Sequence, residues 1–201
     1  MTLPSQIYGI YREQTNDDCE YLTLAFSPLS APLHSRWRNN GLSADFLGDY
    51  VITFLPKEGD FAASRCHELR HTVAYVANEL LENAMKYHAQ GRNIPISLHL
   101  ELTCEYISVS ATNGVDADHA ERYKAFIENL LVGDAGDLLI QRLEESARQE
   151  QPNDSGLGLL TMINDYGACL GWSFDADTRC PGVATVTTRA VLTHTMLRSC
   201  S

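Results

Sequence analysis

Three polar residues within residues 77–87 have the types and the spacing to handle a phosphorylated ligand. Glu79, Asn83 and Lys86 follow one another at i, i+4 and i+7, which places a carboxylate, an amide and an amine along one flank of a helix. A carboxylate can accept a proton, an amide oxygen can bind Mg²⁺, and an amine can pair with phosphate. The spacing therefore indicates a site for a Mg-nucleotide, although a helix with a solvated flank has the same pattern.

These residues belong to a longer helical pattern over residues 60–90, whose apolar positions mark the buried side. At about 100° per residue the polar row falls at the edge of the apolar face, where side chains can face a pocket. The apolar face is formed by Leu69, Val73, Val76, Leu80, Ala84 and Tyr87.

Two segments resemble the nucleotide-binding boxes of a known superfamily. Residues 79–87 resemble the N-box of the GHKL ATPases (gyrase, Hsp90, histidine kinase, MutL) in the pattern Glu79-x-x-x-Asn83-Ala84-x-Lys86-Tyr87. A later segment resembles the G2 box of the same superfamily and opens a second helical pattern, with the sequence Ser155-Gly156-Leu157-Gly158-Leu159-Leu160. The resemblance extends over residues 50–192.

The resemblance implies a role for each of these residues. Glu79 would be the general base that takes the proton of an acceptor hydroxyl, and Asn83 would bind the Mg²⁺ that accompanies ATP. Lys86 would meet phosphate, while Tyr87 would either lean on adenine or pack in the core. In the later box, backbone N–H groups at the start of a helix would bind phosphate; these positions are Ser155, Gly156, Leu157 and Gly158. The alternative for that box is a helix start capped by Asp154 or Ser155 without a ligand.

The third box of the superfamily, G1, departs from its usual strand followed by Asp-x-Gly-x-Gly. Thr112 stands where the adenine-reading aspartate is expected, and Asp116 stands where the second glycine is expected. Asn113 is adjacent, can accept a hydrogen bond from an amino group, and is predicted to substitute together with Gly114. The alternative is the plain end of a hairpin with an Asn-Gly turn.

The segment His67-Glu68-Leu69-Arg70-His71 matches the His-Glu-x-x-His pattern of zinc peptidases. It also resembles the phospho-acceptor box of histidine kinases. Both histidines fall opposite the apolar face of the helix, and no third zinc ligand follows at the usual spacing. We therefore expect His67 and His71 to point to solvent and keep a zinc peptidase only as a minor alternative.

The order of the predicted elements favours a two-layer α/β sandwich, with a mixed, largely antiparallel sheet and helices on one face, as in the GHKL (Bergerat) fold. Strands are predicted at 20–26, 49–55, 96–102, 107–111, 170–175 and 183–191. Helices are predicted at 34–39, 60–90, 119–131, 137–150 and 157–167. We predict an N-terminal extension over residues 1–48 and an ATP-binding domain over 49–195, with a helical lid at 116–154.

Composition limits the classes of function. The net charge of −11 in 201 residues argues against a nucleic-acid surface. No apolar run approaches the length of a membrane span. The six cysteines have no paired spacing and no secretory leader precedes them, so we expect reduced thiols and a cytoplasmic protein.

Small members of the superfamily resemble the anti-sigma-factor serine kinases of bacterial partner-switching systems. By that resemblance, the chain would bind ATP and Mg²⁺ and phosphorylate a serine or threonine on a small STAS-type antagonist. It would act in signal transduction as a bacterial regulator, with a sigma factor as a further partner and a possible homodimer. The alternative is a degenerate member that binds a protein partner and never turns ATP over.

Overall fold

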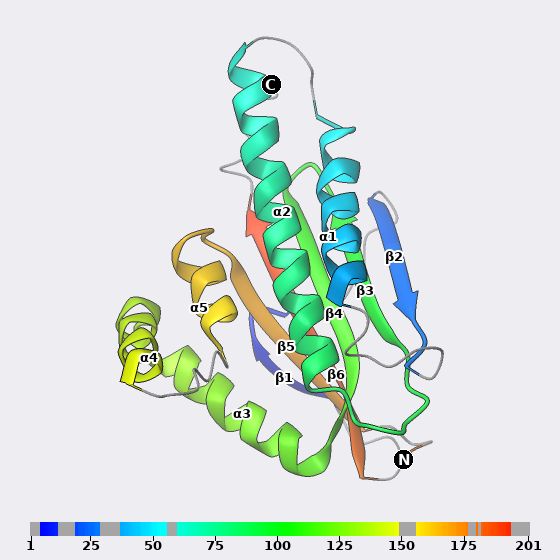
Figure 1. Cartoon of the computed structure of the whole chain (residues 1–201), viewed down its shortest axis with the longest axis vertical. Coiled ribbons are helices and arrows are strands. Elements are labelled where there is room, and N and C mark those ends of the chain that lie inside the picture. The colour runs from blue at the N-terminus through cyan, green and yellow to red at the C-terminus, as the bar shows by residue number, and fades with distance from the viewer. Residues whose placement is uncertain are drawn as a thin grey trace.

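The computed structural model describes residues 5–11, 19–28, 37–55, 60–148, 156–176, 180 and 182–193. Within these ranges the strands form one sheet in the order β1-β5-β6-β4-β3-β2, and each neighbouring pair is antiparallel (Figure 1). The strands are β1 (Gln6–Gly9), β2 (Glu20–Phe26), β3 (Ile96–Leu102), β4 (Tyr106–Asp116), β5 (Cys169–Ala176) and β6 (Val183–Thr193).

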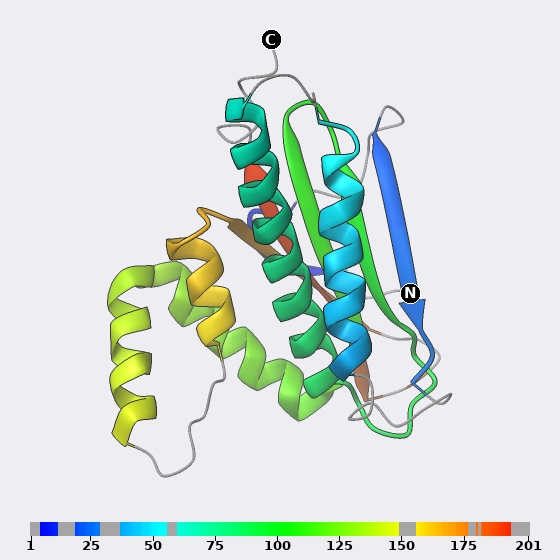
Figure 2. The same ribbon diagram turned by 45° about the horizontal axis from the view of Figure 1, so that its top comes forward.

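The helices of the described ranges lie to one side of this sheet, so the predicted two-layer α/β fold is confirmed (Figures 1 and 2). The long helix α2 runs beside α1, while α3, α4 and α5 lie at the other side of the molecule (Figure 2). They are α1 (Trp37–Ile52), α2 (Asp60–Lys86), α3 (Ala117–Val132), α4 (Ala135–Arg148) and α5 (Leu157–Asn164). No helix in the described part of the chain is both long and apolar enough to cross a membrane.

The core lies between α2 and the sheet, on the face of α2 that the apolar spacing predicts. Leu69, Val73, Val76, Leu80 and Ala84 are all buried, whereas Tyr87 is only partly buried against the same cluster. Burial of one large aliphatic side chain contributes about 1.5–3 kcal/mol. This packing fixes the rotation of α2, and it thereby determines where the polar row at 79, 83 and 86 points.

The strand predicted at 49–55 is wrong, because α1 continues to Ile52 and a turn follows it. The run Tyr-Val-Ile-Thr-Phe is rich in β-branched and aromatic residues, which favours a strand locally. In the fold, Ala44, Leu47 and Val51 are buried at helical spacing. Gly48 lets α1 approach α2 closely, since a Cβ there would lie 2.7 Å from the Arg70 carbonyl oxygen. Tertiary packing therefore overrides the local preference, and α1 crosses the expected domain boundary at 48/49.

The hairpin predicted at 96–111 is present, but its second strand continues to Asp116. Asn113 and Gly114 pair with Val186 and Thr185 of β6 inside the ladder, so the alternative of a hairpin that ends there in an Asn-Gly turn is wrong. The long strand β6 runs alongside β4 as far as Val183 and keeps it extended. Asn113 is therefore held on a rigid strand.

The sheet face away from the helices carries a buried ion pair. An Arg189 Nη atom lies 2.8 Å from Glu101 Oε2, and the side chains are 5% and 2% exposed. The Tyr106 hydroxyl donates to Glu101 Oε1 at 2.6 Å. Burial raises the pKa of Tyr106, and the hydrogen bond to the Glu101 carboxylate adds to this shift. The three groups tie together β3, β4 and β6 on that face.

Candidate functional site

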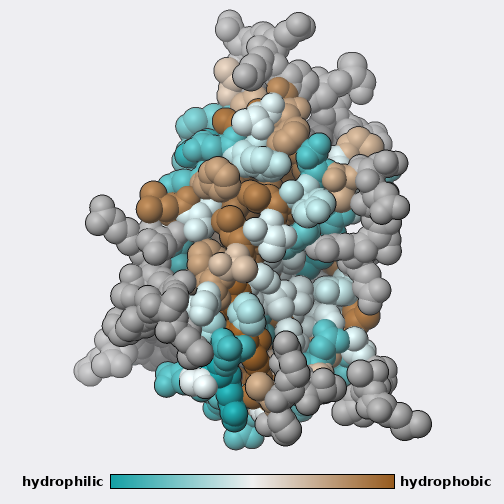
Figure 3. Space-filling view, turned by 90° about the vertical axis from the view of Figure 1, so that its right-hand side faces the viewer, coloured by the Kyte–Doolittle hydropathy of each residue, from teal (hydrophilic) through white to brown (hydrophobic). Residues whose placement is uncertain are grey.

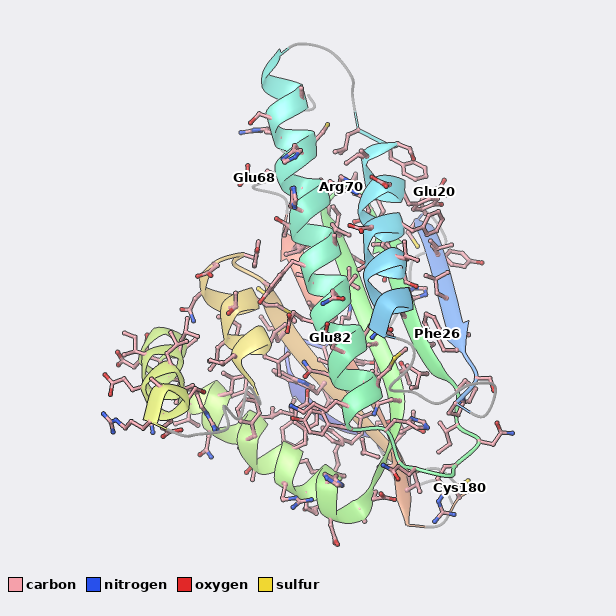
Figure 4. All side chains as sticks on the ribbon, in the orientation of Figure 1. Glu20, Phe26, Glu68, Arg70, Glu82 and Cys180 are labelled. Carbon is pink, nitrogen blue, oxygen red and sulfur yellow. The ribbon has the colours of Figure 1, made fainter. Side chains whose placement is uncertain are left out.

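A pocket of about 440 Å³ opens where the C-terminal end of α2 meets α3, α4 and the start of α5. Figure 4 shows side chains from these elements converging in the space below Glu82, between α2 and α3. The pocket is lined by Asn83, Lys86, Tyr87, Val115, His119, Arg122, Tyr123, Phe126, Arg142, Gly156 and Leu159. It therefore joins residues of both predicted boxes.

The α2 wall contains three of the predicted site residues. Asn83, Lys86 and Tyr87 all line the pocket. The Lys86 amine lies 5.4 Å from the centroid of the Tyr87 ring, at cation–π distance. Lys86 is exposed and Tyr87 is half-buried, so a ligand can meet the amine at the mouth and the ring inside.

The α3 wall consists of residues that the sequence analysis did not single out. His119, Arg122, Tyr123 and Phe126 follow helical spacing, i, i+3, i+4 and i+7, and all line the pocket. The first two side chains carry titratable or cationic nitrogen groups, and the last two are aromatic rings. This spacing was visible in the sequence, and it could have identified the wall of a site for an anion that carries a planar ring.

The pocket is cationic although the chain has a net charge of −11. Lys86, Arg122 and Arg142 come from three different helices and line one cavity. The Arg142 guanidinium lies 5.8 Å from the Phe126 ring centroid, which holds it over the aromatic wall. Cations in a concave, partly apolar site attract an anionic ligand more strongly than cations on an open surface do.

A smaller recess of about 20 Å³ continues the pocket toward the sheet, and it contains Asn113. Asn83, Tyr87, Val115 and Tyr123 line both spaces. Asn113 is 6% exposed, and its amide nitrogen donates to the Gly114 carbonyl oxygen at 3.4 Å, a long and weak hydrogen bond. The amide oxygen and nitrogen of Asn113 can therefore be redirected toward a ligand that enters the recess.

Tyr123 closes this recess. Its hydroxyl accepts a hydrogen bond from Trp172 Nε1 at 2.9 Å and lies 3.2 Å from Thr188 Oγ1. Burial raises the pKa of Tyr123. A recess of about 20 Å³ has room for roughly one water molecule, so an aromatic ring can reach Asn113 only if side chains that line the recess move.

The start of α5 brings two glycines to the site for different reasons. Gly156 lines the pocket and has φ of 93°, a left-handed conformation that a residue with a side chain rarely adopts. It is the N-cap of α5, so the alternative of a helix start capped by Asp154 or Ser155 is wrong. Leu157 is half-buried and does not line the pocket, whereas Leu159 does. Ser155 and Asp154 lie outside the described residues.

Gly158 lies beneath the carboxylate of Glu79. A Cβ at position 158 would lie 2.8 Å from Glu79 Cδ and 3.2 Å from Glu79 Cγ, so a side chain there would displace the carboxylate. Burial raises the pKa of the half-buried Glu79 carboxyl, and the charge of Glu82 raises it further. Glu79 lies one helical turn from Asn83, with about 5–6 Å between their Cβ atoms. Glu79 does not itself line the pocket. A carboxylate of raised pKa one helical turn from the lining residue Asn83 is suited to accept a proton near neutral pH.

Gly114 and Thr112 lie away from the pocket. A Cβ at Gly114 would lie 2.7 Å from Ile94 Cδ1, so this glycine allows close packing against Ile94. The Thr112 hydroxyl oxygen lies 2.9 Å from the Thr187 hydroxyl oxygen, on the sheet face opposite the helices. Of the residues predicted for the segment that departs from the G1 pattern, only Asn113 lies on the pocket side.

The zinc alternative gains no support from the geometry. His67 and His71 are both exposed, as predicted, with ring centroids 4.5 Å apart. Among the residues that the structure describes, no group of three or more His, Cys, Asp or Glu side chains could hold a metal ion. The two histidines therefore form a surface pair at the N-terminal half of α2.

Comparison with known proteins supports the fold. No protein-family model matches the chain, and no curated protein gives a significant match in sequence. The chain is similar to a chain in the crystal structure of the SiaB-SiaC complex from Pseudomonas aeruginosa, with a TM-score of 0.53 and 20% sequence identity. The similarity covers 84% of this chain and 89% of that chain. At this level of identity the match shows that the two chains share a fold.

Proposed function

We propose that the chain binds Mg-ATP in the 440 Å³ pocket and transfers the terminal phosphoryl group to a serine or threonine of a protein partner. The observation that carries this proposal is the meeting of Asn83 and Lys86 with Gly156 in one cationic pocket. These residues belong to segments about 70 residues apart in the sequence, and the fold brings them to one pocket. A triphosphate with a planar base matches the cations at the mouth and the aromatic rings of the walls.

Glu79 is the proposed general base for the transfer. The acceptor hydroxyl oxygen forms a bond to the γ-phosphorus, the bond from that phosphorus to the β,γ-bridging oxygen breaks, and ADP leaves. Glu79 takes the proton of the hydroxyl as this occurs. Replacement of Glu79 by Gln retains the size of the side chain but removes the proton acceptor, so transfer should fall about 10²–10⁴-fold while nucleotide binding persists.

Asn83 fits the proposed role toward Mg²⁺. Its amide lines both the pocket and the recess, and a Mg²⁺ ion that accompanies a triphosphate needs only one or two protein oxygens. The ion would neutralise part of the phosphate charge. Lys86 would then hold the phosphates through the point charge of its amine, and Arg142 would hold them through its planar guanidinium.

A thermal-melting experiment tests nucleotide binding. Mg-ATP should raise the melting midpoint of the full chain, because a ligand at about 100 times its Kd stabilises the folded state by about 2.7 kcal/mol. Lys86→Ala and Arg142→Ala should reduce the shift, and Asn83→Ala should remove its dependence on Mg²⁺. Arg148→Ala is the matched control, since Arg148 is on the same helix as Arg142, is 76% exposed and pairs with Glu144 outside the pocket.

The outcomes of this experiment separate the possibilities. No shift at millimolar Mg-ATP would contradict the proposal. An equal loss of the shift in Arg142→Ala and Arg148→Ala would indicate a general charge effect and would remove the phosphates from this pocket.

The partner of the proposed kinase is a second protein. The structurally similar chain comes from a complex of SiaB with SiaC, which supports a regulatory protein that acts on a protein partner. We propose a small STAS-type antagonist as the acceptor, within a bacterial signal-transduction system that also controls a sigma factor. Incubation with γ-labelled ATP and candidate antagonists from the same genome, with Glu79→Gln as the negative control, would identify it.

One observation favours a second candidate, a protein-binding module that does not turn ATP over. The recess that contains Asn113 measures only about 20 Å³, and Tyr123 in its wall is held by a hydrogen bond from Trp172 and lies near Thr188. If the recess stays this small, a base cannot reach Asn113. Mg-ATP that binds without any transfer of the γ-phosphoryl group to a protein acceptor would support this candidate over the kinase.

A further inference from the structure

The hydrogen-bonding groups of the recess can each act in both directions. Among the described residues that line the pocket and the recess, none is Asp or Glu, although the chain contains 26 of them. A carboxylate only accepts hydrogen bonds, whereas an amide or a hydroxyl can donate as well as accept. The polar residues that line the recess are all of the second kind, namely Asn83, Tyr87, Asn113, Tyr123 and Thr188. The recess therefore contains no group that accepts hydrogen bonds without also donating them.

The amide of Asn113 can rotate at little cost. Its nitrogen donates to the Gly114 carbonyl oxygen at 3.4 Å, which is longer than a good hydrogen bond. The same carbonyl oxygen accepts a hydrogen bond from the Ala89 backbone N–H at 2.8 Å. Rotation of the amide therefore breaks only the long bond and leaves the Gly114 carbonyl with its better partner. The backbone of Asn113 stays fixed during this rotation, because it belongs to the ladder between β4 and β6.

The pocket directs the edge of a planar base toward this amide. Lys86 and Arg142 supply the cations for the phosphates, while Tyr87 and Tyr123 line both the pocket and the recess. A base that stacks on these two rings has its phosphates at the cations and its far edge at the entrance of the recess. Side chains around the recess must move to admit that edge, and Asn113 is then the amide that the edge meets.

The two purine bases present opposite hydrogen-bonding edges. Adenine has an amino donor at N6 beside an acceptor at N1, and guanine has an acceptor at O6 beside a donor at N1. Rotation of the Asn113 amide by about 180° exchanges its oxygen and its nitrogen, so it can form two hydrogen bonds with either edge. A site rejects the wrong ligand strongly only where that ligand leaves a buried polar group unpaired. Neither purine does so at Asn113.

We propose that the pocket binds adenine and guanine nucleotides with similar affinity, because the Asn113 amide rotates to match either base. This inference rests on the proposed function and widens its nucleotide from ATP to both purine triphosphates. The Thr188 hydroxyl, which lies 3.2 Å from the Tyr123 hydroxyl, adapts in the same way because it can donate to O6 or accept from N6. GTP can then replace ATP in the transfer, with Glu79 taking the same proton and GDP leaving.

Titration calorimetry of the full chain with Mg-ATP and with Mg-GTP tests the inference directly. The two dissociation constants should agree within about tenfold, the factor that one missing hydrogen bond produces. A preference for either nucleotide by more than this factor overturns the inference and leaves the proposed function intact. If neither nucleotide binds at millimolar concentration, both the inference and the proposed function are overturned.

Two variants of Asn113 test whether its amide contacts the base. Asn113→Asp leaves a group that can accept from N6 but repels O6, so GTP should weaken at least about tenfold relative to ATP. Asn113→Ala removes the contact for both bases, so both nucleotides should weaken by the same factor and their ratio should stay near one. An unchanged ratio in a folded Asn113→Asp protein, or unchanged affinities in Asn113→Ala, overturns the inference.

The matched control is Asn40→Asp, which makes the same change at another buried amide. Asn40 is 1% exposed and Asn113 is 6% exposed. Asn40 belongs to α1, which lies on the side of the molecule that Figure 3 views, away from α3, α4 and α5. Asn40→Asp should lower stability but keep the ratio of the two affinities. Far-UV circular dichroism shows whether each variant is folded, and the parent titrations and Asn113→Ala still decide the question if Asn113→Asp is not.

Discussion

Replacement of Gly158 by alanine should separate the stability of this protein from its activity. The new Cβ would lie 2.8 Å from Glu79 Cδ, whereas carbon atoms pack best at about 3.5–4.0 Å. The Glu79 carboxylate must therefore retreat by roughly 1 Å. Because this carboxylate is the end of a flexible side chain, rotation of the side chain can move it, and the backbone of α5 need not shift.

The expected cost in stability is small. Alanine in a helix interior is favoured over glycine by about 1 kcal/mol, and a first-turn position such as 158 gains less. Moving a half-buried carboxylate offsets this gain, so we expect the free energy of unfolding to stay within about 1 kcal/mol of the parent. Activity should respond more strongly, because a catalytic group displaced by about 1 Å can cost 10²-fold in rate.

Urea denaturation and the transfer of label from γ-labelled ATP to the acceptor protein measure the two effects on the same samples. Gly41→Ala is the positive control for stability, since a Cβ at Gly41 in α1 meets no atom within 4 Å. It should stabilise the protein by about 0.5–1 kcal/mol without changing turnover. Gly48→Ala is the negative control, because its Cβ would lie 2.7 Å from the rigid Arg70 carbonyl oxygen and should cost about 1–3 kcal/mol.

A double-mutant cycle refutes or supports the assigned contact. In a Glu79→Ala background the obstacle is absent, so Gly158→Ala should become stabilising, and the difference between the two backgrounds is the coupling energy. If Gly158→Ala changes stability equally in both backgrounds and turnover is unaffected, the carboxylate does not lie over Gly158 in solution.

Three further predictions follow from the geometry. Glu79→Gln should raise the melting midpoint at pH 7 but not near pH 4. The pKa of Glu79 in the folded protein lies above its unfolded value of about 4.3. The parent therefore loses stability as the pH rises from the unfolded pKa through the folded pKa, and this loss persists at higher pH. Without nucleotide, amides of α3 and α4 should exchange faster than those of β3 and slow when Mg-ATP is added, because α4 has no buried residue; equal exchange with and without ATP would make these helices a fixed layer. Arg189→Met should lower the free energy of unfolding, measured in urea, by about 3–5 kcal/mol, because the buried Glu101 carboxylate loses its cation. The double variant Arg189→Met/Glu101→Leu should recover most of this loss. An additive loss in the double variant would show that the two residues are not coupled.

The sequence predicts the long elements of the fold well because their apolar spacing is set by burial on one side. In α2, the apolar positions from Leu69 to Ala84 all face the core, and the polar row lies at the margin as expected. The hairpin at 96–111 is predicted for the same reason, since alternate residues are buried against the helices. The four-residue strand β1 was missed because so short a segment shows no period, and only its pairing with β5 defines it.

The errors arise where contacts distant in sequence decide the local structure. Residues 49–52 are helical because α1 packs on α2 at Gly48, which no local pattern reveals. Asn113 and Gly114 remain in a strand because β6 pairs with them. In both places a local preference, for a strand or for a turn, was overridden by a partner more than 15 residues away in the sequence.

The site was predicted in part for similar reasons. Asn83, Lys86 and Tyr87 were identified because residue type and helical spacing together specify a pocket flank. The opposite wall on α3 had a readable spacing, but its aromatic residues also suit an ordinary core face. Arg142 could not be predicted, because its place in the pocket depends on how α4 folds back toward α3. The contact between Glu79 and Gly158 likewise requires the tertiary packing of α2 against α5.

The order of strands in the sheet has a consequence for synthesis of the chain. The two edges, β1 and β2, both come from the first 26 residues, while β1 pairs with β5 at residues 171–174 (Figure 1). A ribosome that adds 5–20 residues per second needs roughly 10–30 s to make the stretch between these two strands. During that time β1 lacks its partner strand β5, so a strand that is made early is among the last to be placed. Completion of the sheet is therefore a step that follows translation of the C-terminal strands.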